Sequence, residues 1–256
     1  MDTLKKLFRN IQTLFPWLQE LRFSLRTWVI RTFNKPPEDD FLLIRKFQPS
    51  SDQVFLDVGA NRGDMILCMM LNEKLDNKII GFEPNGVIFK STAERSFIKN
   101  NPRVDLLNIG LSSQGGELTL YTPQYRNWAF DGLSSFSYEN AYKWLRNGMW
   151  NFNEKLLTIQ QHSCKVEPLD HYNYNPYFIK IDVEGFELDV IKGAFKTIEK
   201  HLPILLIEDI TEDIKALLHP LGYTFYGFKK DHGLYEGSGE LNTFCLQPQQ
   251  FKLLSK

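Results

Sequence analysis

Beyond residue 36, short apolar stretches alternate with longer amphipathic stretches, and this alternation constrains the fold more than any other feature of the sequence. Short apolar runs that end in glycine, asparagine or acidic residues are typical of buried parallel strands, and amphipathic stretches between them are typical of helices. We therefore expect an α/β fold with a mostly parallel sheet and helices on both faces. The predicted strands are residues 54–58, 78–82, 104–109, 178–183, 204–208, 223–228 and 243–246, and the predicted helices are residues 63–74, 86–100, 185–200 and 211–221.

The composition of the chain limits which partners it is expected to bind and in which compartment it is expected to reside. With 43% hydrophobic residues, 24% charged residues and a net charge of −1, it has no global attraction to nucleic acid. The cysteines Cys68, Cys164 and Cys245 lie far apart without a CxxC pair, which predicts free thiols in a reducing cytosol. The first residues are charged where a signal peptide would be apolar, and no apolar run is long enough to span a membrane. We expect a cytoplasmic protein.

Residues 1–35 form a basic segment with helical periodicity. Seven basic and two acidic residues give this segment a net charge of +5, which leaves −6 for the rest of the chain. Its apolar residues recur every three or four positions and so share one helical face, and Pro16 predicts a break that makes a helical hairpin. These residues are Leu4, Leu7, Ile11, Leu14, Leu18, Leu21, Leu25 and Trp28.

Two explanations of this face stay open. It could attach the protein to an anionic membrane surface, such as the inner face of the cell membrane, or to a partner helix. It could equally pack on its own domain or on a second subunit. Pro36 and Pro37 mark a linker, so we divide the chain into an amphipathic arm, residues 1–35, and a domain, residues 36–256.

The ends of the first two predicted strands carry a cofactor signature. The first strand runs into DVGANRGD, and the second runs into GFEPN, whose Glu83 lies 24 residues beyond Gly59. A carboxylate at this place can accept hydrogen bonds from both hydroxyls of a ribose. The GxxxG spacing of Gly59 and Gly63 differs from the GxGxxG of dinucleotide sites, and Asp57 and Asp64 on either side favour a ligand with positive charge. S-adenosylmethionine fits both conditions, and a nucleotide-dependent oxidoreductase is the alternative.

The third and fourth strand ends supply further polar candidates. NIGLSS offers Asn108 and Ser112 near an adenine, although either could be a plain turn residue. In FIKIDVEGFELDVIKG, Asp182 and Glu184 stand where strand gives way to helix, and either carboxylate could accept the proton of an attacking hydroxyl. Both could instead cap the following helix, whose first turn favours negative charge.

A metal site is a further possibility at this edge. Glu187 lies one turn beyond Glu184, and Glu208 and Asp209 end the fifth strand, which should lie beside the fourth. Such an oxygen-rich cluster could bind Mg²⁺ or Ca²⁺. Acid-rich strand ends without a metal are the simpler expectation, and Lys180 could pair with these acids or point away from the cofactor.

Taken in order, DVGANRGD, GFEPN, NIGLSS and IKIDVEGFE resemble the FkbM family of S-adenosylmethionine-dependent methyltransferases over about residues 52–210. The resemblance implies a class I methyltransferase fold, Rossmann-like, with about seven strands. It also implies methyl transfer to a hydroxyl, often on a sugar of a glycan, a glycolipid or a natural product. By motif position, Asp57, Gly59, Asn61 and Gly63 would hold the methionine end of the cofactor, and Glu83 would hold its ribose.

Residues 122–156 form a long connection rich in aromatic residues before the predicted strand LLTIQQHSC. Long insertions in compact domains are often lids or binding loops, and aromatic faces with asparagine, arginine and serine between them suit stacking on sugar rings. The aromatic residues could also form the core of a small helical subdomain, as the spacing of Tyr138, Tyr142, Leu145 and Met149 allows. His162, on the following strand, is an alternative base or a structural residue.

Together these features predict an S-adenosylmethionine-dependent O-methyltransferase that acts on a small-molecule or glycan acceptor, in glycan biosynthesis or a comparable pathway. A non-catalytic module that binds the cofactor or a partner is the alternative from a different class, and the acids at Asp57, Glu83 and Asp182 speak against it. A nucleic-acid substrate is disfavoured because the domain beyond residue 35 is acidic and would repel phosphates.

Overall fold

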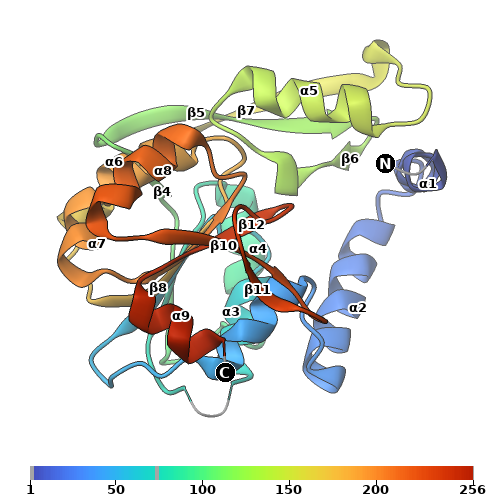
Figure 1. Cartoon of the computed structure of the whole chain (residues 1–256). Coiled ribbons are helices and arrows are strands. Elements are labelled where there is room, and N and C mark those ends of the chain that lie inside the picture. Colours follow the sequence, from blue (N-terminus) through green and yellow to red (C-terminus); the bar gives the residue numbers. More distant parts are fainter. Residues whose placement is uncertain (1–2, 73–74, 256) are drawn as a thin grey trace.

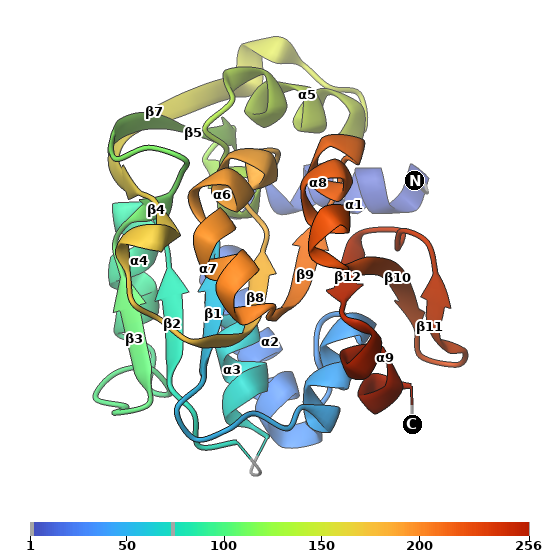
Figure 2. The same ribbon diagram turned by 60° about the vertical axis from the view of Figure 1, so that its left-hand side comes forward.

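A computed structural model describes residues 3–72 and 75–255 and shows a central sheet of eight strands in the order β11-β10-β12-β9-β8-β1-β2-β3. Strands β3, β2, β1, β8 and β9 are parallel to one another, whereas β12 runs antiparallel between β9 and β10. The mostly parallel α/β sheet is therefore confirmed (Figure 2). The strands are β1 (Val54–Val58), β2 (Ile79–Phe82), β3 (Val104–Leu107), β8 (Pro176–Ile181), β9 (Ile204–Glu208), β10 (Thr224–Lys229), β11 (Gly233–Glu236) and β12 (Asn242–Leu246).

The sequence predicted seven of these strands and missed β11. This strand pairs antiparallel with β10 through a tight turn at Gly233, whose φ is +74°. Its four residues are all partly or fully exposed, so they lack the apolar run that identified the other strands. The glycine supplies the left-handed turn geometry at no steric cost.

Helices cover both faces of the sheet because neighbouring strand residues point to opposite sides. Phe55 and Phe178 lie in the cluster that packs on α3, α9 and the 3-10 helix η1. Leu56 and Ile179 lie in the cluster that packs on α6, α7 and α8. The domain helices are α3 (Asp64–Met70), α4 (Gly86–Ala93), α6 (Glu187–Gly193), α7 (Phe195–His201), α8 (Glu212–Leu218) and α9 (Pro248–Leu254), with η1 at Asp39–Lys46.

Several predicted element bounds differ from the structure. The predicted helix 185–200 is two helices, α6 and α7, and the predicted helix 63–74 ends at Met70, with residues 73–74 outside the described residues. Residues 1–2 of the arm and residue 256 of the domain also lie outside them. Cys68, Cys164 and Cys245 are free thiols, as expected, and the last two are buried.

The aromatic stretch belongs to a second layer that stands above the carboxyl ends of the central strands (Figures 1 and 2). A four-stranded sheet in the order β4-β7-β5-β6 carries it, and the predicted connection begins inside β5. Its elements are β4 (Gly110–Leu111), β5 (Gly116–Tyr125), β6 (Trp128–Ala129), the 3-10 helix η2 (Asp131–Leu133), α5 (Tyr138–Gly148), the 3-10 helix η3 (Glu154–Leu156) and β7 (Leu157–Glu167). Tyr125, Trp128, Phe130, Leu145 and Met149 form a core of their own. Of the expected helical core, Leu145 and Met149 take part, whereas Tyr138 is 52% exposed and Tyr142 lies outside it.

The arm consists of two helices, α1 (Thr3–Gln12) and α2 (Leu18–Phe33), and the break falls around Pro16 as predicted. The helices meet at an open angle instead of forming a hairpin: α1 lies beside the second layer and α2 descends along the domain (Figure 1). Among the described residues, no helix is both long enough and apolar enough to cross a membrane.

Gly193 holds the two layers together by a close backbone contact. A Cβ atom added at this position would lie 2.0 Å from the carbonyl oxygen of Ser112, in the loop that follows β4. Ser112 and Ser113 also donate hydrogen bonds to Asp189, one turn earlier in α6. The break between α6 and α7 therefore occurs at a position where only glycine permits the loop after β4 to approach the helix backbone.

We expect Gly193→Ala to lower the free energy of unfolding by about 1–3 kcal/mol, the usual effect of forcing one extra carbon into a filled site. Urea denaturation measures the loss. Gly115→Ala is the matched control, because its added carbon would meet only the carbonyl oxygen of Val166, at 3.9 Å. The control should change stability by less than about 0.5 kcal/mol. Equal effects of the two substitutions would contradict the close-contact explanation.

Candidate active site

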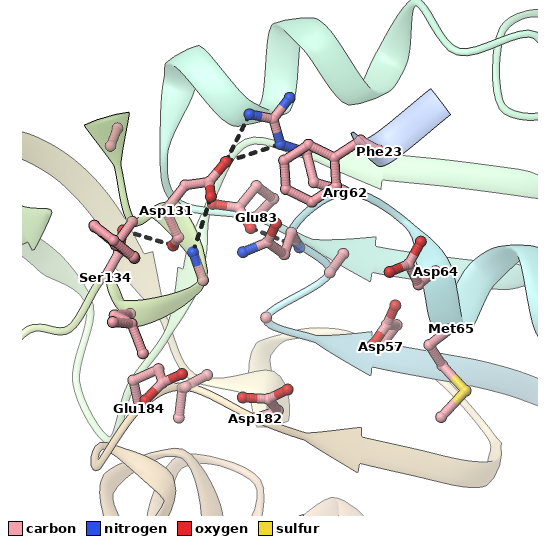
Figure 3. Close-up of a pocket in the computed structure, with 18 of the residues that line it drawn as sticks. Phe23, Asp57, Arg62, Asp64, Met65, Glu83, Asp131, Ser134, Asp182 and Glu184 are labelled. Atoms are coloured by element: carbon pink, nitrogen blue, oxygen red, sulfur yellow. Dashed lines mark hydrogen bonds and ion pairs between the residues drawn. The ribbon is translucent and has the colours of Figure 1, made fainter. Parts of the chain in front are cut away.

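A cavity of about 340 Å³ lies where the carboxyl ends of β1, β2 and β8 meet the second layer and the arm. Its walls include Asp57 and Glu83 from the sheet, Asp131 from η2, and Phe23 from α2. Figure 3 shows these side chains around the cavity, with Asp182 and Glu184 at its lower side. Most of the residues predicted at the first, second and fourth strand ends are thus brought together.

The glycine turn after β1 is shaped by its neighbours. Gly59 has φ +82°, and a Cβ atom there would lie 1.8 Å from the carbonyl oxygen of Asp182. Asn61 and Gly63 also adopt the left-handed conformation, with φ of +44° and +79°. A side chain at Gly59 would therefore fill the gap between β1 and β8, beside the cavity wall.

Asp57 is a buried carboxylate that accepts no hydrogen bond from the described residues. Only 1% of the residue is exposed, and both carboxylate oxygens are buried without a partner. Burial raises the pKa of Asp57 to about 6, with Asp182 adding to the effect and Lys180 opposing it. Buried polar atoms normally find a partner, so this carboxylate fits a cationic group of a ligand.

Glu83 ends β2 and is also buried. Its two carboxylate oxygens accept hydrogen bonds from the backbone N–H groups of Asn61 and Asn85, each at 2.8 Å. Burial raises the pKa of Glu83 to about 7, although these two hydrogen bonds oppose the rise. Each oxygen keeps a second lone pair that a hydroxyl could use.

Asn108 and Ser112 do not line the cavity. The side-chain amide of Asn108 donates to the carbonyl oxygens of Glu83 and Pro84, at 2.8 and 3.1 Å, and so fixes the loop that follows β2. Ser112 donates to Asp189 and holds the second layer against α6. A direct contact of either residue with a cofactor stays a prediction.

Lys180, Asp182 and Glu208 form a coupled group beneath the cavity. The ammonium of Lys180, which is buried, lies 2.6 Å from Asp182 Oδ2. Burial opposes the charge of Asp182, but Lys180 and a hydrogen bond with Glu208 outweigh it and lower the pKa of Asp182. Burial and the charge of Asp182 raise the pKa of Glu208 to about 10. Asp182 is therefore the ionised partner at neutral pH, and Glu208 holds the proton of their hydrogen bond.

Glu184 stands at the junction of two cavities. The second cavity, of about 520 Å³, shares Leu133, Trp144 and Glu184 with the first and extends between α5 and the ends of β8 and β9. Burial, Asp182 and Glu187 together raise the pKa of Glu184 to about 8. Its backbone has φ +53°, and its carbonyl oxygen accepts a hydrogen bond from Ser135 at 2.7 Å. The second layer thus fixes the backbone at Glu184.

The alternative role of Asp182 and Glu184 as helix caps is not borne out, because α6 begins after Phe186 and no side chain of the described residues caps its first turn. The carboxylate of Glu187 accepts hydrogen bonds from the backbone N–H groups of Val183 and Gly185, at 3.2 and 3.0 Å. These bonds close the turn before α6 from inside the helix. The side chains of Asp182 and Glu184 face the cavity instead (Figure 3).

Asp182, Glu184 and Glu208 each offer an oxygen within 4.8 Å of the others, a spacing that could hold one divalent ion. Lys180 already supplies positive charge to Asp182. Magnesium at this cluster stays a prediction. His162 lies on β7, paired with Leu120, and lines neither cavity.

Arg62 is the functional residue that the sequence did not single out. Its buried guanidinium contacts Asp131 through Nε at 2.8 Å and Nη2 at 2.6 Å, and Glu20 through Nη1 at 2.8 Å. It also stacks over the ring of Phe23, 4.4 Å from the centroid. One side chain of the glycine turn therefore joins the second layer and the arm around the cavity, and no spacing in the sequence pairs these residues.

The strand order, the glycine turn and the acid at the end of β2 are those of the class I methyltransferase fold. The profile of the family described as "Methyltransferase FkbM domain" matches residues 57–225, about two thirds of the chain. The chain therefore belongs to the FkbM methyltransferase family. The resemblance predicted from the four motifs is confirmed.

Solved structures of other methyltransferases are similar at low sequence identity. The FkbM methyltransferase of Methylobacillus flagellatus KT has 16% identity and a TM-score of 0.44, over 78% of this chain and 45% of that chain. This chain thus matches less than half of that protein. A SAM-dependent O-methyltransferase from Thermotoga maritima has 10% identity and a TM-score of 0.40, over 86% of this chain and 69% of that chain. No curated protein sequence matches the chain significantly.

The pH dependence of stability should report the proton on Glu208. The pKa of Glu208 is raised from 4.5 to about 10 in the folded protein, so between these values only the folded state keeps the proton. Stability therefore falls as pH rises through this window. Glu208→Gln keeps a donor to Asp182 without titrating, and we expect it to flatten the fall of melting temperature with pH. The exposed Glu212→Gln is the control, and an equally steep fall in both variants would refute the assignment.

Cofactor affinity should depend on Glu83. We expect Glu83→Ala to weaken binding of S-adenosylmethionine and S-adenosylhomocysteine about 10- to 100-fold in calorimetry, since hydrogen bonds to a charged group contribute about 1.5–3 kcal/mol. Glu83→Gln tests the same ribose contact but keeps a side-chain oxygen that can accept a hydrogen bond from a backbone N–H group. Glu94→Ala, at an exposed carboxylate, is the control. Unchanged affinity in both Glu83 variants would remove the ribose assignment.

Proposed function

We propose that the protein transfers a methyl group from S-adenosylmethionine to a hydroxyl of a sugar or a comparable hydroxylated small molecule. The observation that supports this most directly is the position of Glu184, which lines both cavities at their junction. The first cavity holds the residues suited to the cofactor, so the second is the place for the acceptor.

The residues of the first cavity suit the two ends of the cofactor. The carboxylate of Asp57 would bind its ammonium group, and the carboxylate of Glu83 would accept hydrogen bonds from its ribose hydroxyls. Gly59 lets the backbone of Asp182 lie directly against the turn after β1, which lines this cavity. When bound, S-adenosylmethionine supplies an electrophilic methyl group on a positively charged sulfur.

Glu184 is the better-supported base of the two predicted catalytic residues. As the acceptor oxygen takes up the methyl group that S-adenosylmethionine would supply, the hydroxyl proton must leave. A carboxylate whose pKa of about 8 lies near neutral pH can receive that proton. Asp182 is held ionised by Lys180, so its role is to provide negative charge near the positive centre.

The second cavity has the character of a carbohydrate site. Trp144 offers an aromatic face, and Asn140 and Asn147 offer amide groups on the same helix. The apolar face of a sugar ring packs on aromatic side chains while its hydroxyls bind amides and carboxylates. Lys6 also lines this cavity, whereas the charge of Lys143 is paired with Glu139.

Calorimetry and a transfer assay test the proposal. Binding of S-adenosylmethionine and S-adenosylhomocysteine, but not of NAD, is expected. Transfer of tritiated methyl from S-adenosylmethionine to methyl glycosides and nucleoside-diphosphate sugars would then identify the acceptor class. Binding of NAD alone would favour an oxidoreductase. Cofactor binding without transfer to any hydroxylated acceptor would favour the non-catalytic binding module.

We expect kcat/KM for the acceptor to rise with pH up to about 8 and then level off, because Glu184 must lose its proton to act as a base. Glu184→Gln should lower kcat by about 10²- to 10⁴-fold, remove this pH dependence, and leave the affinity for S-adenosylhomocysteine unchanged. The exposed Glu240→Gln is the control. Turnover of Glu184→Gln at the rate of the control would return the role of base to Asp182.

A further inference from the structure

The apolar stripe of the arm faces solvent. Among the residues whose exposure the structure describes, fifteen large hydrophobic residues are exposed. Ten of them lie between residues 7 and 33, and the exposed fractions of Phe8 and Trp17 reach 69% and 68%. The ten are Leu7, Phe8, Ile11, Leu14, Phe15, Trp17, Leu21, Leu25, Trp28 and Phe33. The expectation that this stripe packs on its own domain is therefore wrong for most of its length.

Polar side chains, together with the buried Ile30 and the partly buried Leu18, attach the arm to the domain. Gln19 donates to the carbonyl oxygen of Ala129 at 2.9 Å, and Arg26 pairs with Asp64 at 2.8 Å. Arg126 of the second layer donates to the side chains of Asn10 and Thr13, each at 2.7 Å. Rotating the arm so that the stripe faced the domain would break all of these contacts. The partner of the stripe must therefore be another molecule.

The exposed surface continues onto the second layer. Trp144 and Trp150 are 38% and 46% exposed, and both lie against α1. The guanidinium of Arg9 stacks over Trp144 at 4.4 Å, and the side chain of Asn10 donates to the carbonyl oxygen of Trp150. In Figure 1, α1 and α5 form one end of the molecule, beside the top of α2. The apolar face therefore spans α1, α2, Trp144 of α5 and Trp150 in the loop that follows α5.

Charge decides which partner fits this face. The arm carries +5, and Lys5, Arg22, Arg31 and Lys35 are exposed on it, whereas its acid Glu20 is paired with Arg62. Two copies joined through their arms would bring like charges together. An anionic surface with an apolar interior complements both the charge and the stripe, and tryptophan is well suited to such a boundary.

We propose that the outward face of α1 and α2 docks the protein on an anionic lipid surface. The inward face of α2 lines the cofactor cavity through Gln19, Phe23 and Arg26. Docking would therefore place the catalytic cavity within one helix diameter, about 10 Å, of the lipid headgroups. This consequence rests on the proposed function and gives access to acceptors held at the membrane, whereas the docking itself does not depend on catalysis.

Vesicle flotation tests the proposal. We expect the full chain to float with equimolar phosphatidylcholine and phosphatidylglycerol vesicles, to float poorly with phosphatidylcholine alone, and to dissociate as salt screens the charges. The double substitution Leu21→Glu, Leu25→Glu should reduce flotation at least about tenfold, because it places two charges in the apolar stripe. Both positions are more than half exposed, so the variant should keep its melting temperature.

Leu241→Glu is the matched control, since Leu241 is 45% exposed but lies outside the arm. It should float like the unchanged chain. Failure of the unchanged chain to float, or equal flotation of the double variant, would overturn the proposal. A dimer in light scattering that the double variant splits, without vesicle binding, would also overturn it and assign the stripe to a second copy. The affinity for S-adenosylhomocysteine, measured on the same samples, tests the proposed function separately.

Discussion

The buried ion pair between Arg62 and Asp131 is the interaction on which the site depends. A guanidinium without a partner in this environment would carry an uncompensated charge, and breaking such a pair typically costs about 3–5 kcal/mol. The pair fixes η2 against the glycine turn, while a third nitrogen of Arg62 reaches Glu20 on the arm. The sheet forms the base of the cavity, and the side chain of Arg62 holds η2 and the arm, which form its walls.

The carboxyl groups at the strand ends act differently because their surroundings differ. Lys180 keeps Asp182 ionised, and Asp182 in turn keeps the proton on Glu208. Glu184, which forms no ion pair with the described residues, has a pKa of about 8. A row of chemically similar acids is thereby divided into a fixed negative charge, a hydrogen-bond donor and a group that can exchange a proton near neutral pH.

Local features of the sequence predicted the sheet and most of the strand-end residues that line the first cavity, because strand periodicity, the turn at Gly59 and the place of Glu83 are all short-range signals. The sequence did not predict the features that depend on contacts between residues far apart in the chain. The partners of Arg62 come from residues 42 positions before it and 69 positions after it. The outward direction of the arm follows from polar contacts with β6, α5 and α3, which its own periodicity does not encode. The strand β11 was missed because its exposed residues have no apolar pattern.

Three residues other than glycine adopt left-handed backbone angles at the ends of neighbouring strands. They are Asn61 after β1, Glu184 after β8 and Asp209 after β9. Such conformations cost about 1–3 kcal/mol for a residue with a side chain, and glycine would relieve the cost. Selection for heat resistance alone would therefore favour glycine at these positions. It would also remove the side chain of Glu184 from the junction of the two cavities. At this edge of the sheet, selection for stability would favour glycine, whereas selection for the proposed turnover would keep the side chain of Glu184.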